Sequence, residues 1–207
     1  MMKKYDYKVD DKLEYLPPAH PTVVRVKPHN YICVKGEGNP NGEAFGRDVE
    51  ILYALSYAIK MSYKGSDIPL GYYDYTVFPL EGIWDVRDKT LIDFNKDNLM
   101  YTIMIRQPDF VNEEVFKKFR ILTKKKKGNP DIEKATFETI EDGWCCTMMH
   151  IGSFDDEPAS FAKMEMFVKE SGYVRCDKTH REIYLSDPRK TEVSKMKTVL
   201  RFKVEEV

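Results

Sequence analysis

The order of secondary-structure signals repeats along the chain, and this repetition limits the fold more than any other feature of the sequence. A strand, a glycine-bearing loop, a long helix and two further strands are expected from about residue 31 to 106, and again from about 144 to 204. Two such units side by side would form one antiparallel-rich sheet with both long helices on one face. The sequence therefore predicts an α+β fold of duplicated strand-helix-strand-strand units, with a curved sheet and a ligand pocket at the pseudo-dyad.

Local patterns predict the individual elements. The predicted helices cover residues 43–60, 112–120 and about 157–171, each with a capping residue before it or a glycine after it. The predicted strands cover residues 22–37 (one or two strands), 72–78, 99–106, 137–140, 144–150, 180–185 and 198–204. Residues 79–86 are expected to form a bulge or turn, and residues 141–143 a hairpin turn.

The length predicts one domain. A chain of 207 residues can bury one sizeable core and is short for two ordinary domains. We expect a single domain over residues 1–207, with an N-terminal arm over 1–21 and two pseudo-repeats at about 22–110 and 134–207.

Charge and composition argue against several classes of partner. Lys and Arg (33) almost cancel Asp and Glu (34), so there is no general attraction to nucleic acid or to anionic membranes. The run Lys124–Lys127 is interpreted as a solvated helix end. No segment approaches a transmembrane helix or a secretory signal, which predicts a soluble cytoplasmic protein. The oligomeric state stays open.

Neither the cysteines nor the histidines have the spacing of a metal site. The four cysteines are expected to be reduced, mostly core-facing thiols, and a catalytic role for Cys145 or Cys146 is disfavoured. The four histidines lack an HxxxH-type spacing. We therefore expect no metal and no cofactor.

Residues 179–188 contain the most informative candidates. In a strand, alternate side chains share a face, so His180, Glu182 and Tyr184 should lie on one side, with Ile183 and Leu185 turned toward the helices. A carboxylate in an apolar cavity has a raised proton affinity, which suits Glu182 to general acid/base chemistry. The alternative is a solvated strand glutamate.

Other candidates are aromatic or acidic. Flat side chains could hold an aromatic ligand by stacking, and the candidates are Trp84, Trp144, Tyr72 and Tyr101. Packing in the core is the alternative for each of them. Glu157 precedes a predicted helix, where capping is the ordinary role of a carboxylate.

Five ordered motifs resemble the GyrI-like small-molecule-binding family. They are KGEGNPNG, PLEGIWD, MIRQPDFV, MHIGSFDDEPAS and HREIYLSDPRKT, and the similarity extends from about residue 5 to 204. The chain is most similar to the free-standing branch of that family, whose members are cyclopropanoid hydrolases. The family fold is a duplicated strand-helix-strand-strand unit, in agreement with the repeat described above.

The resemblance implies specific roles. Glu182 matches the key pocket glutamate of the family, and Trp84 would form a wall of the pocket. Glu182 would deprotonate water for attack on the cyclopropane of a DNA-alkylating antibiotic, while Tyr184 or Glu157 would hydrogen-bond the oxygen on which charge develops. The alternative is a non-catalytic module that binds or sequesters an aromatic drug, or inhibits a protein partner. The natural substrate stays open.

Overall fold

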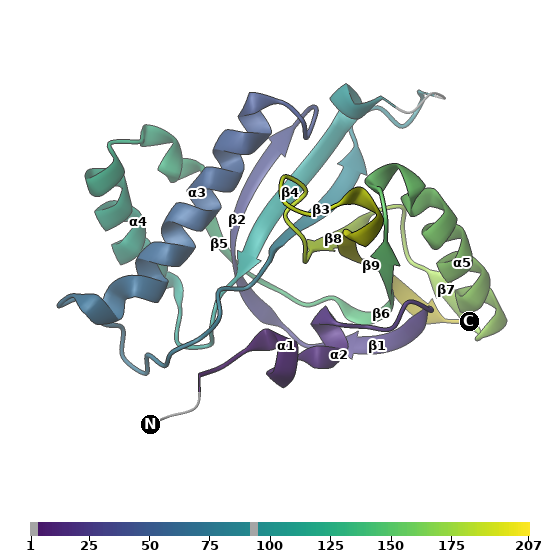
Figure 1. Cartoon of the computed structure of the whole chain (residues 1–207), viewed down its shortest axis with the longest axis horizontal. Coiled ribbons are helices and arrows are strands. Elements are labelled where there is room, and N and C mark those ends of the chain that lie inside the picture. Colours follow the sequence, from purple (N-terminus) through teal and green to yellow (C-terminus); the bar gives the residue numbers. More distant parts are fainter. Residues whose placement is uncertain (1–3, 92–94) are drawn as a thin grey trace. The chain divides into compact units, whose positions relative to one another are not determined.

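The computed structural model describes residues 4–91 and 95–207, and it has the α+β architecture that the sequence predicts (Figure 1). The chain divides into two compact units that are interleaved in the sequence. The first unit contains residues 29–80 and 86–140, with 4–6, and the second contains residues 7–28, 81–85 and 141–207. In each unit a long helix packs against antiparallel strands. The limits of the two pseudo-repeats stay a prediction.

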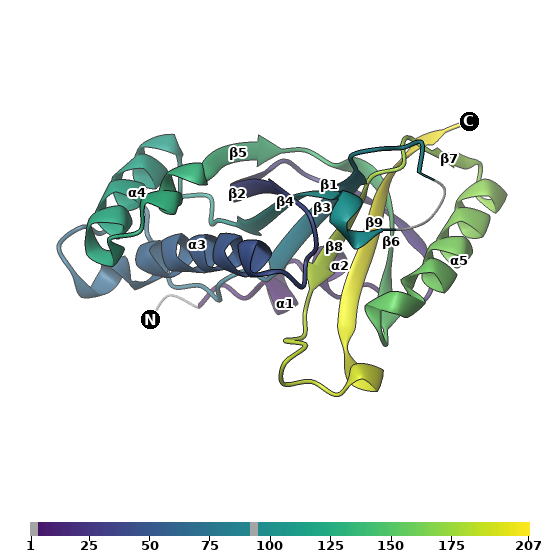
Figure 2. The same ribbon diagram turned by 90° about the horizontal axis from the view of Figure 1, so that it is seen from above.

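The first unit has a sheet in which β2 (His29–Glu37) lies between β4 (Leu99–Arg106) and β5 (Thr136–Ile140), antiparallel to both. Helix α3 (Glu43–Lys60) contacts β2 and β4, and α4 (Glu113–Lys127) lies against α3 (Figure 2). The apolar side of α3 is buried here, as the helical spacing of its apolar residues predicts.

The helix ends of this unit follow the capping signals in the sequence. Gly42 is the N-cap of α3, and the Asn112 side chain accepts a hydrogen bond of 2.9 Å from the Val115 amide at the start of α4. The four lysines from Lys124 occupy the last turn of α4, where cations complement the helix dipole, and Gly128 ends the helix at φ 64°. The predicted solvated helix end is confirmed.

The second unit contains a sheet in the order β1-β6-β9-β8-β3, with the short β7 also paired to β9. The strands are β1 (Thr22–Val26), β6 (Gly143–Ile151), β9 (Lys197–Glu206), β8 (His180–Tyr184), β3 (Leu80–Val86) and β7 (Tyr173–Arg175). Helix α5 (Glu157–Glu170) covers one face of this sheet. Its Met164 and Val168 pack on side chains of β6 and β9, namely Cys146, Met148, Leu200, Phe202 and Val204.

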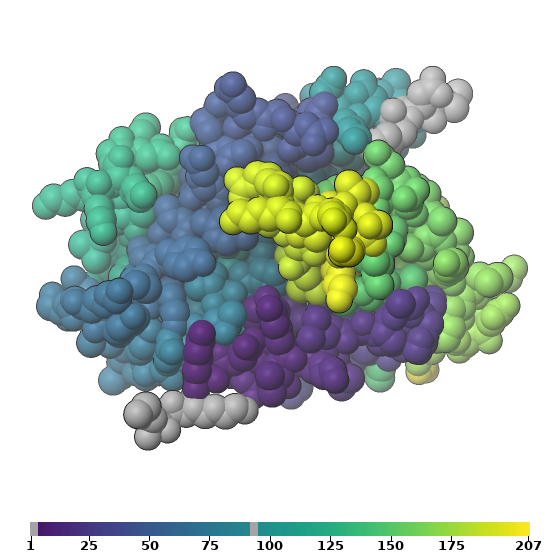
Figure 3. All heavy atoms as spheres, in the orientation of Figure 1, coloured from purple at the N-terminus to yellow at the C-terminus, as the bar shows by residue number. Residues whose placement is uncertain are grey.

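Short helices complete the chain. They are α1 (Tyr7–Asp10), α2 (Lys12–Tyr15) and the 3-10 helices Met61–Lys64, Lys96–Asn98, Pro130–Lys134, Phe154–Asp156 and Val193–Lys195. The N-terminal arm is more ordered than its polar sequence predicts, because Tyr7 and Tyr15 are buried with their ring centroids 5.0 Å apart. The segment between β8 and β9 lies at the surface, where Figure 3 shows it in yellow-green. Among the described residues, no helix is long and apolar enough to cross a membrane.

The strand predicted at 72–78 is wrong, and so is the turn predicted at 79–86. Residues 72–78 form only an isolated bridge at Tyr75, and their aromatic rings pack among themselves and on Phe110 instead of forming a ladder. The strand is β3, which contains Gly82 and Trp84. A glycine in a strand often marks a close approach of another group, and here that group is the indole of Trp84.

The hairpin predicted at residues 141–143 is also wrong. Strand β5 pairs with β2, whereas β6 pairs with β1 and β9, so the two strands flanking the turn are not partners. Gly143 does have the left-handed backbone conformation that is typical of a turn, with φ 68°. The side chain of Asp142 is bound by two buried arginines instead of stabilising a two-stranded turn.

Candidate active site

Three side chains of β8 share one face of the sheet, as the alternation predicts. Glu182 is opposite Leu200 of β9, and Leu200 belongs to the core under α5, so this face is the one that α5 covers. The prediction that Ile183 faces the helices while Glu182 faces away is therefore wrong for α5. The sequence period fixes which residues share a face, but it does not say which face a helix covers.

A chain of hydrogen bonds ends on the carboxylate of Glu182. The indole Nε1 of Trp84 donates to the Tyr184 hydroxyl over 2.8 Å, and that hydroxyl donates to Glu182 Oε2 over 2.8 Å. His180 Nε2 lies 2.9 Å from Glu182 Oε1. Glu182 is only 9% exposed, so these contacts replace much of the hydration that its charge loses. The alternative of a solvated strand glutamate is excluded.

Glu157 provides a second carboxyl group at the same place. It is the first residue of α5, is 7% exposed, and interacts with Glu182 through both charge and a side-chain hydrogen bond. Burial, and then the neighbouring charge of Glu182, raise the pKa of Glu157 to about 9. Glu157 is therefore protonated near neutral pH. Its Oε1 atom has no hydrogen-bond partner among the described residues.

His150 anchors the start of the helix that carries Glu157. Its Nε2 lies 2.9 Å from the Ser153 carbonyl oxygen, which can only accept, so Nε2 carries a hydrogen. Its Nδ1 lies 2.9 Å from the Ser160 hydroxyl, one helical turn beyond Glu157. The imidazole thus ties the end of β6 to the first turn of α5. Sequence reasoning assigned no role to this histidine.

Two aromatic rings that sequence reasoning missed lie beside the carboxyl pair. Phe154 meets Tyr184 edge to face at 5.9 Å between centroids, and Phe161 meets His180 in the same way at 4.8 Å. Phe154 is 39% exposed, so a ligand at the surface can reach its ring. The signal for Phe154 was available, because it lies within the motif MHIGSFDDEPAS.

Gly82 provides the space that Trp84 occupies. A Cβ at this position would lie 2.8 Å from Trp84 Nε1 and 3.3 Å from the Tyr184 hydroxyl oxygen. The absence of a side chain at Gly82 therefore allows the indole to reach Tyr184.

Replacing Gly82 by alanine is expected to displace the indole and lower stability by about 1–3 kcal/mol, as overpacking does. In a Trp144→Phe background, the fluorescence of Trp84 should shift to longer wavelength. The matched control is Gly46→Ala, since a Cβ at this helical position meets open space and should stabilise the fold by about 0.5–1 kcal/mol. An unchanged spectrum for Gly82→Ala would contradict this account.

The raised pKa of Glu157 predicts a pH dependence of stability. Between pH 4.5 and about 9 the folded chain holds a proton that the unfolded chain has lost. The free energy of unfolding should therefore fall as pH rises through this window, by up to about 1.4 kcal/mol per pH unit from this group. Urea unfolding of the wild type and of Glu157→Gln, at pH 5.5 and 8.5, isolates the contribution. If the free energy of unfolding changes equally between the two pH values in both proteins, Glu157 is not protonated in the folded state.

The remaining aromatic candidates are not part of this cluster. Trp144 belongs to the same unit but lies near the start of β6, six residues from His150, and is 47% exposed. Tyr101 and Tyr72 belong to the first unit. The Tyr101 hydroxyl donates to Asp48 over 3.0 Å, and the Tyr72 hydroxyl donates to the Lys60 carbonyl over 2.8 Å. Their role in binding stays a prediction.

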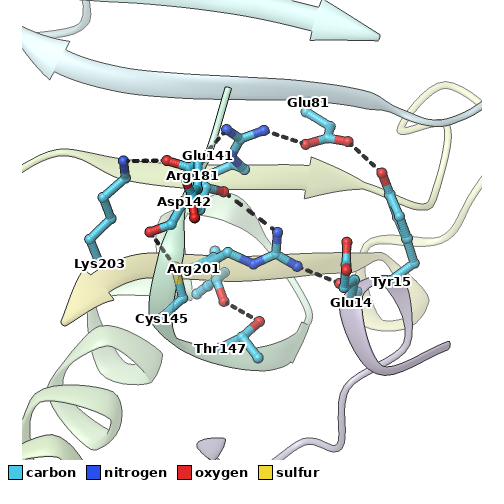
Figure 4. A network of polar contacts seen from close by, with 11 residues as sticks. Glu14, Tyr15, Glu81, Glu141, Asp142, Cys145, Thr147, Arg181, Arg201 and Lys203 are labelled. Carbon is cyan, nitrogen blue, oxygen red and sulfur yellow. Dashed lines mark hydrogen bonds and ion pairs between the residues drawn. The ribbon is translucent and has the colours of Figure 1, made fainter. Parts of the chain in front are cut away.

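A buried ionic network lies on the opposite face of β8 (Figure 4). Arg181 binds Glu81 at 2.7 Å and Asp142 at 3.0 Å, and Arg201 lies 3.8 Å from the other oxygen of Asp142. Tyr15 donates to Glu81 over 3.0 Å. Each of the four charged side chains is at most 6% exposed. The network links β8 and β3, the two strands that carry Glu182 and Trp84.

The cysteines are free, and three of the four are buried, as expected. Burial is the main cause that raises the pKa of Cys145 and of Cys146 to about 12. A thiol with such a pKa is protonated at neutral pH, which argues against a nucleophilic role for either residue.

Known proteins resemble this chain over almost its whole length. A family model described as the GyrI-like small molecule binding domain matches residues 19–205. Three crystal structures from Listeria innocua cover 98% of this chain and 100% of their own. One is of an uncharacterized conserved protein, with 39% identity and a TM-score of 0.92. Two are of hydrolases, with 38% and 39% identity and TM-scores of 0.90 and 0.91.

More distant structures share the fold alone. The C-terminal domain of EcmrR is 13% identical with a TM-score of 0.54, covering 91% of this chain and 98% of that one. No curated protein matches the chain. The family model covers most of the sequence and the resemblance predicted from the five motifs is confirmed, so this chain belongs to the GyrI-like small-molecule-binding domain family.

Proposed function

We propose that this protein hydrolyses the strained cyclopropane of aromatic, DNA-alkylating cyclopropanoid antibiotics and so protects the cell. The observation that carries the proposal is the pair of buried carboxyl groups, Glu157 and Glu182, of which Glu157 has a pKa raised by burial and by the charge of Glu182. Two carboxyl groups whose environments separate their proton affinities provide an acid and a base side by side. The two Listeria innocua hydrolases, at 38% and 39% identity, support an enzymatic function.

The roles follow from the hydrogen bonds. Glu182 accepts a hydrogen bond from Tyr184, and we assign it the role of the base that orients a water molecule and accepts its proton as the water attacks the cyclopropane methylene. The ring C–C bond breaks, and its electron pair moves through the conjugated system to the carbonyl oxygen. Glu157, protonated below pH 9, donates its proton to that oxygen. The Tyr184 hydroxyl is already bound to Glu182, so Tyr184 positions the base.

The same pair restores itself after each turnover. The proton that Glu182 takes from water can pass to Glu157 across their hydrogen bond, which returns both groups to their starting states. The net reaction consumes one substrate and one water. No step in this scheme calls on a metal or a redox cofactor. The rate should fall as pH rises through about 9, because Glu157 then loses its proton.

Aromatic side chains would hold a flat substrate beside the carboxyl groups. Phe154 lies against Tyr184, and Phe161 lies against His180. Trp84 is hydrogen-bonded to Tyr184 and adds a third aromatic side chain. Such rings favour aromatic ligands through stacking and burial of apolar surface. The three buried free thiols fit a reducing compartment, and we propose the cytoplasm.

The test is incubation of the purified protein with a cyclopropapyrroloindole antibiotic, followed by mass spectrometry of the products. Catalytic formation of a product one water heavier than the substrate supports the hydrolase. If the antibiotic is bound stoichiometrically and released unchanged, the protein is a sequestering module and the proposed activity is wrong.

A further inference from the structure

The carboxyl pair is shielded from bulk water. Glu157 and Glu182 are both buried, the Tyr184 hydroxyl covers Glu182 Oε2, and Phe154 packs against the ring of that tyrosine. In the proposed reaction Glu157 turns its O–H from Glu182 to the substrate oxygen, which breaks the direct route for a proton between the two glutamates. While that hydrogen bond is broken, the proton that Glu182 takes from water needs another way out.

His180 contacts the pair and is also open to solvent. Its Nε2 lies 2.9 Å from Glu182 Oε1, so one ring nitrogen is committed to the carboxylate. Its Nδ1 has no hydrogen-bond partner among the residues that the structure describes. The side chain is 24% exposed. The imidazole therefore lies between a buried carboxylate and water.

A small, partly open hollow gives water access to this imidazole. His180 is the first residue of β8 and lines the hollow together with Phe202 and Lys203. The volume of the hollow is about 30 Å³, which is room for about two water molecules. Asp142 and Arg201 also line it (Figure 4), and each has a buried polar atom without a hydrogen-bond partner among the described residues. Such atoms hold ordered water in folded proteins.

The groups around the imidazole leave Glu182 as its direct proton partner. Phe161 of α5 meets the ring edge to face at 4.8 Å between centroids, and Arg175 of β7 lies over Phe161 at 5.8 Å. The charged groups that line the hollow with His180 are Asp142, Arg181, Arg201 and Lys203. The hydrogen bond of His180 joins it to Glu182, so a proton on the ring passes to this carboxylate.

We propose that His180 relays protons between the carboxyl pair and solvent, an inference that rests on the hydrolase function proposed above. In the resting state Nε2 carries a hydrogen that it donates to the Glu182 carboxylate, and Nδ1 holds a lone pair. Solvent protonates Nδ1 through water in the hollow, and Nε2 passes its own proton to Glu182. One proton enters, and the imidazole stays neutral. The reverse sequence releases the proton that Glu182 takes from the attacking water.

The relay is tested without substrate by following the proton on Glu157. Glutamate labelled with carbon-13 in the carboxyl group gives a resonance for Glu157, assigned by its loss in Glu157→Gln. Near pH 9, which is about the pKa of Glu157, relaxation dispersion of this resonance measures the rate of proton exchange. His180→Gln keeps an N–H donor for Glu182 but cannot carry a proton, so the exchange should slow by roughly 10²-fold.

Added imidazole separates a relay from a structural role. In His180→Ala the missing ring leaves space for free imidazole, which should restore most of the exchange rate and of the turnover of substrate. In His180→Gln the amide fills that space, so imidazole should have little effect. The matched control is His20→Gln, at an exposed position of the same unit and outside the hollow, which should exchange at the wild-type rate.

The outcomes distinguish the relay from the hydrolase. Wild-type exchange in both His180 variants overturns the relay, and so does a failure of imidazole to restore exchange in His180→Ala. Slowed exchange that imidazole restores, in a protein that forms no hydrated product from the antibiotic, supports the relay and contradicts the hydrolase instead.

Discussion

Glu182→Gln is expected to lower the turnover of a cyclopropanoid substrate by roughly 10²–10⁴-fold while leaving its binding nearly unchanged, because general-base assistance contributes about this much. Glutamine keeps the size of the side chain and its carbonyl oxygen can still accept from Tyr184 or His180, so the cluster keeps its shape. It cannot accept a proton from water. The measurements are single-turnover kinetics and ligand titration followed by fluorescence.

The control for this variant is Glu170→Gln, at an exposed position near the end of the same helix that carries Glu157. It removes the same charge away from the carboxyl pair and should react at the wild-type rate. Hydrolysis by Glu182→Gln at the wild-type rate would rule out Glu182 as the base. Loss of binding together with turnover would instead make Glu182 a ligand-binding residue.

The local elements of this fold could be predicted from the sequence where one signal dominates. The helix over residues 43–60 has the predicted limits, since its apolar spacing extends over the whole segment. The aromatic run at 72–78 has the composition of a strand, yet its rings form a cluster with Phe110. Propensity favours strands in such a run, but packing partners distant in sequence decide the outcome.

The candidate site was predictable in part. The alternation of side chains along a strand correctly predicted that His180, Glu182 and Tyr184 share one face. The family motifs drew attention to Trp84 and Glu157. The protonated state of Glu157 was not predictable, because it depends on burial and on a glutamate 25 positions away in the sequence. Without knowledge of Glu182 as a neighbour, the position of Glu157 at the start of α5 suggests only a helix-capping role.

The buried ionic network was missed for a related reason. Its members are far apart in the sequence, with 100 positions between Arg181 and Glu81. Taken alone, each charged residue is expected to lie at the solvated surface. Asp142 also lies in a sequence with turn composition, which favoured the wrong hairpin. Arg181 enters the network through the fold, because β8 pairs with β9 and places it opposite Arg201, and it also contacts Glu81 of β3.

Arg181→Met is expected to lower the free energy of unfolding by about 3–5 kcal/mol, because removing one partner of a buried ion pair leaves uncompensated charge. Glu81, which is 0% exposed, would lose its cationic partner at 2.7 Å and keep the hydrogen bond from Tyr15, while Asp142 would keep Arg201 at 3.8 Å. The loss should be visible in urea unfolding, where the midpoint falls and the slope is retained.

Two further variants show whether charge or packing causes this loss. The double variant Arg181→Met/Glu81→Leu removes both charges of the pair and should recover at least about half of the stability, because a buried pair can often be replaced by apolar residues at little cost. Arg189→Met breaks an ion pair with Asp187 in which the arginine is 84% exposed, and it should change stability by less than about 1 kcal/mol. If the double variant is as unstable as Arg181→Met alone, the guanidinium acts through its packing and the electrostatic account of the network fails. If the double variant recovers and also keeps the hydrogen bond between Trp84 and Tyr184, the ion pair is not what aligns β3 with β8, and apolar packing between these strands is sufficient to hold the site.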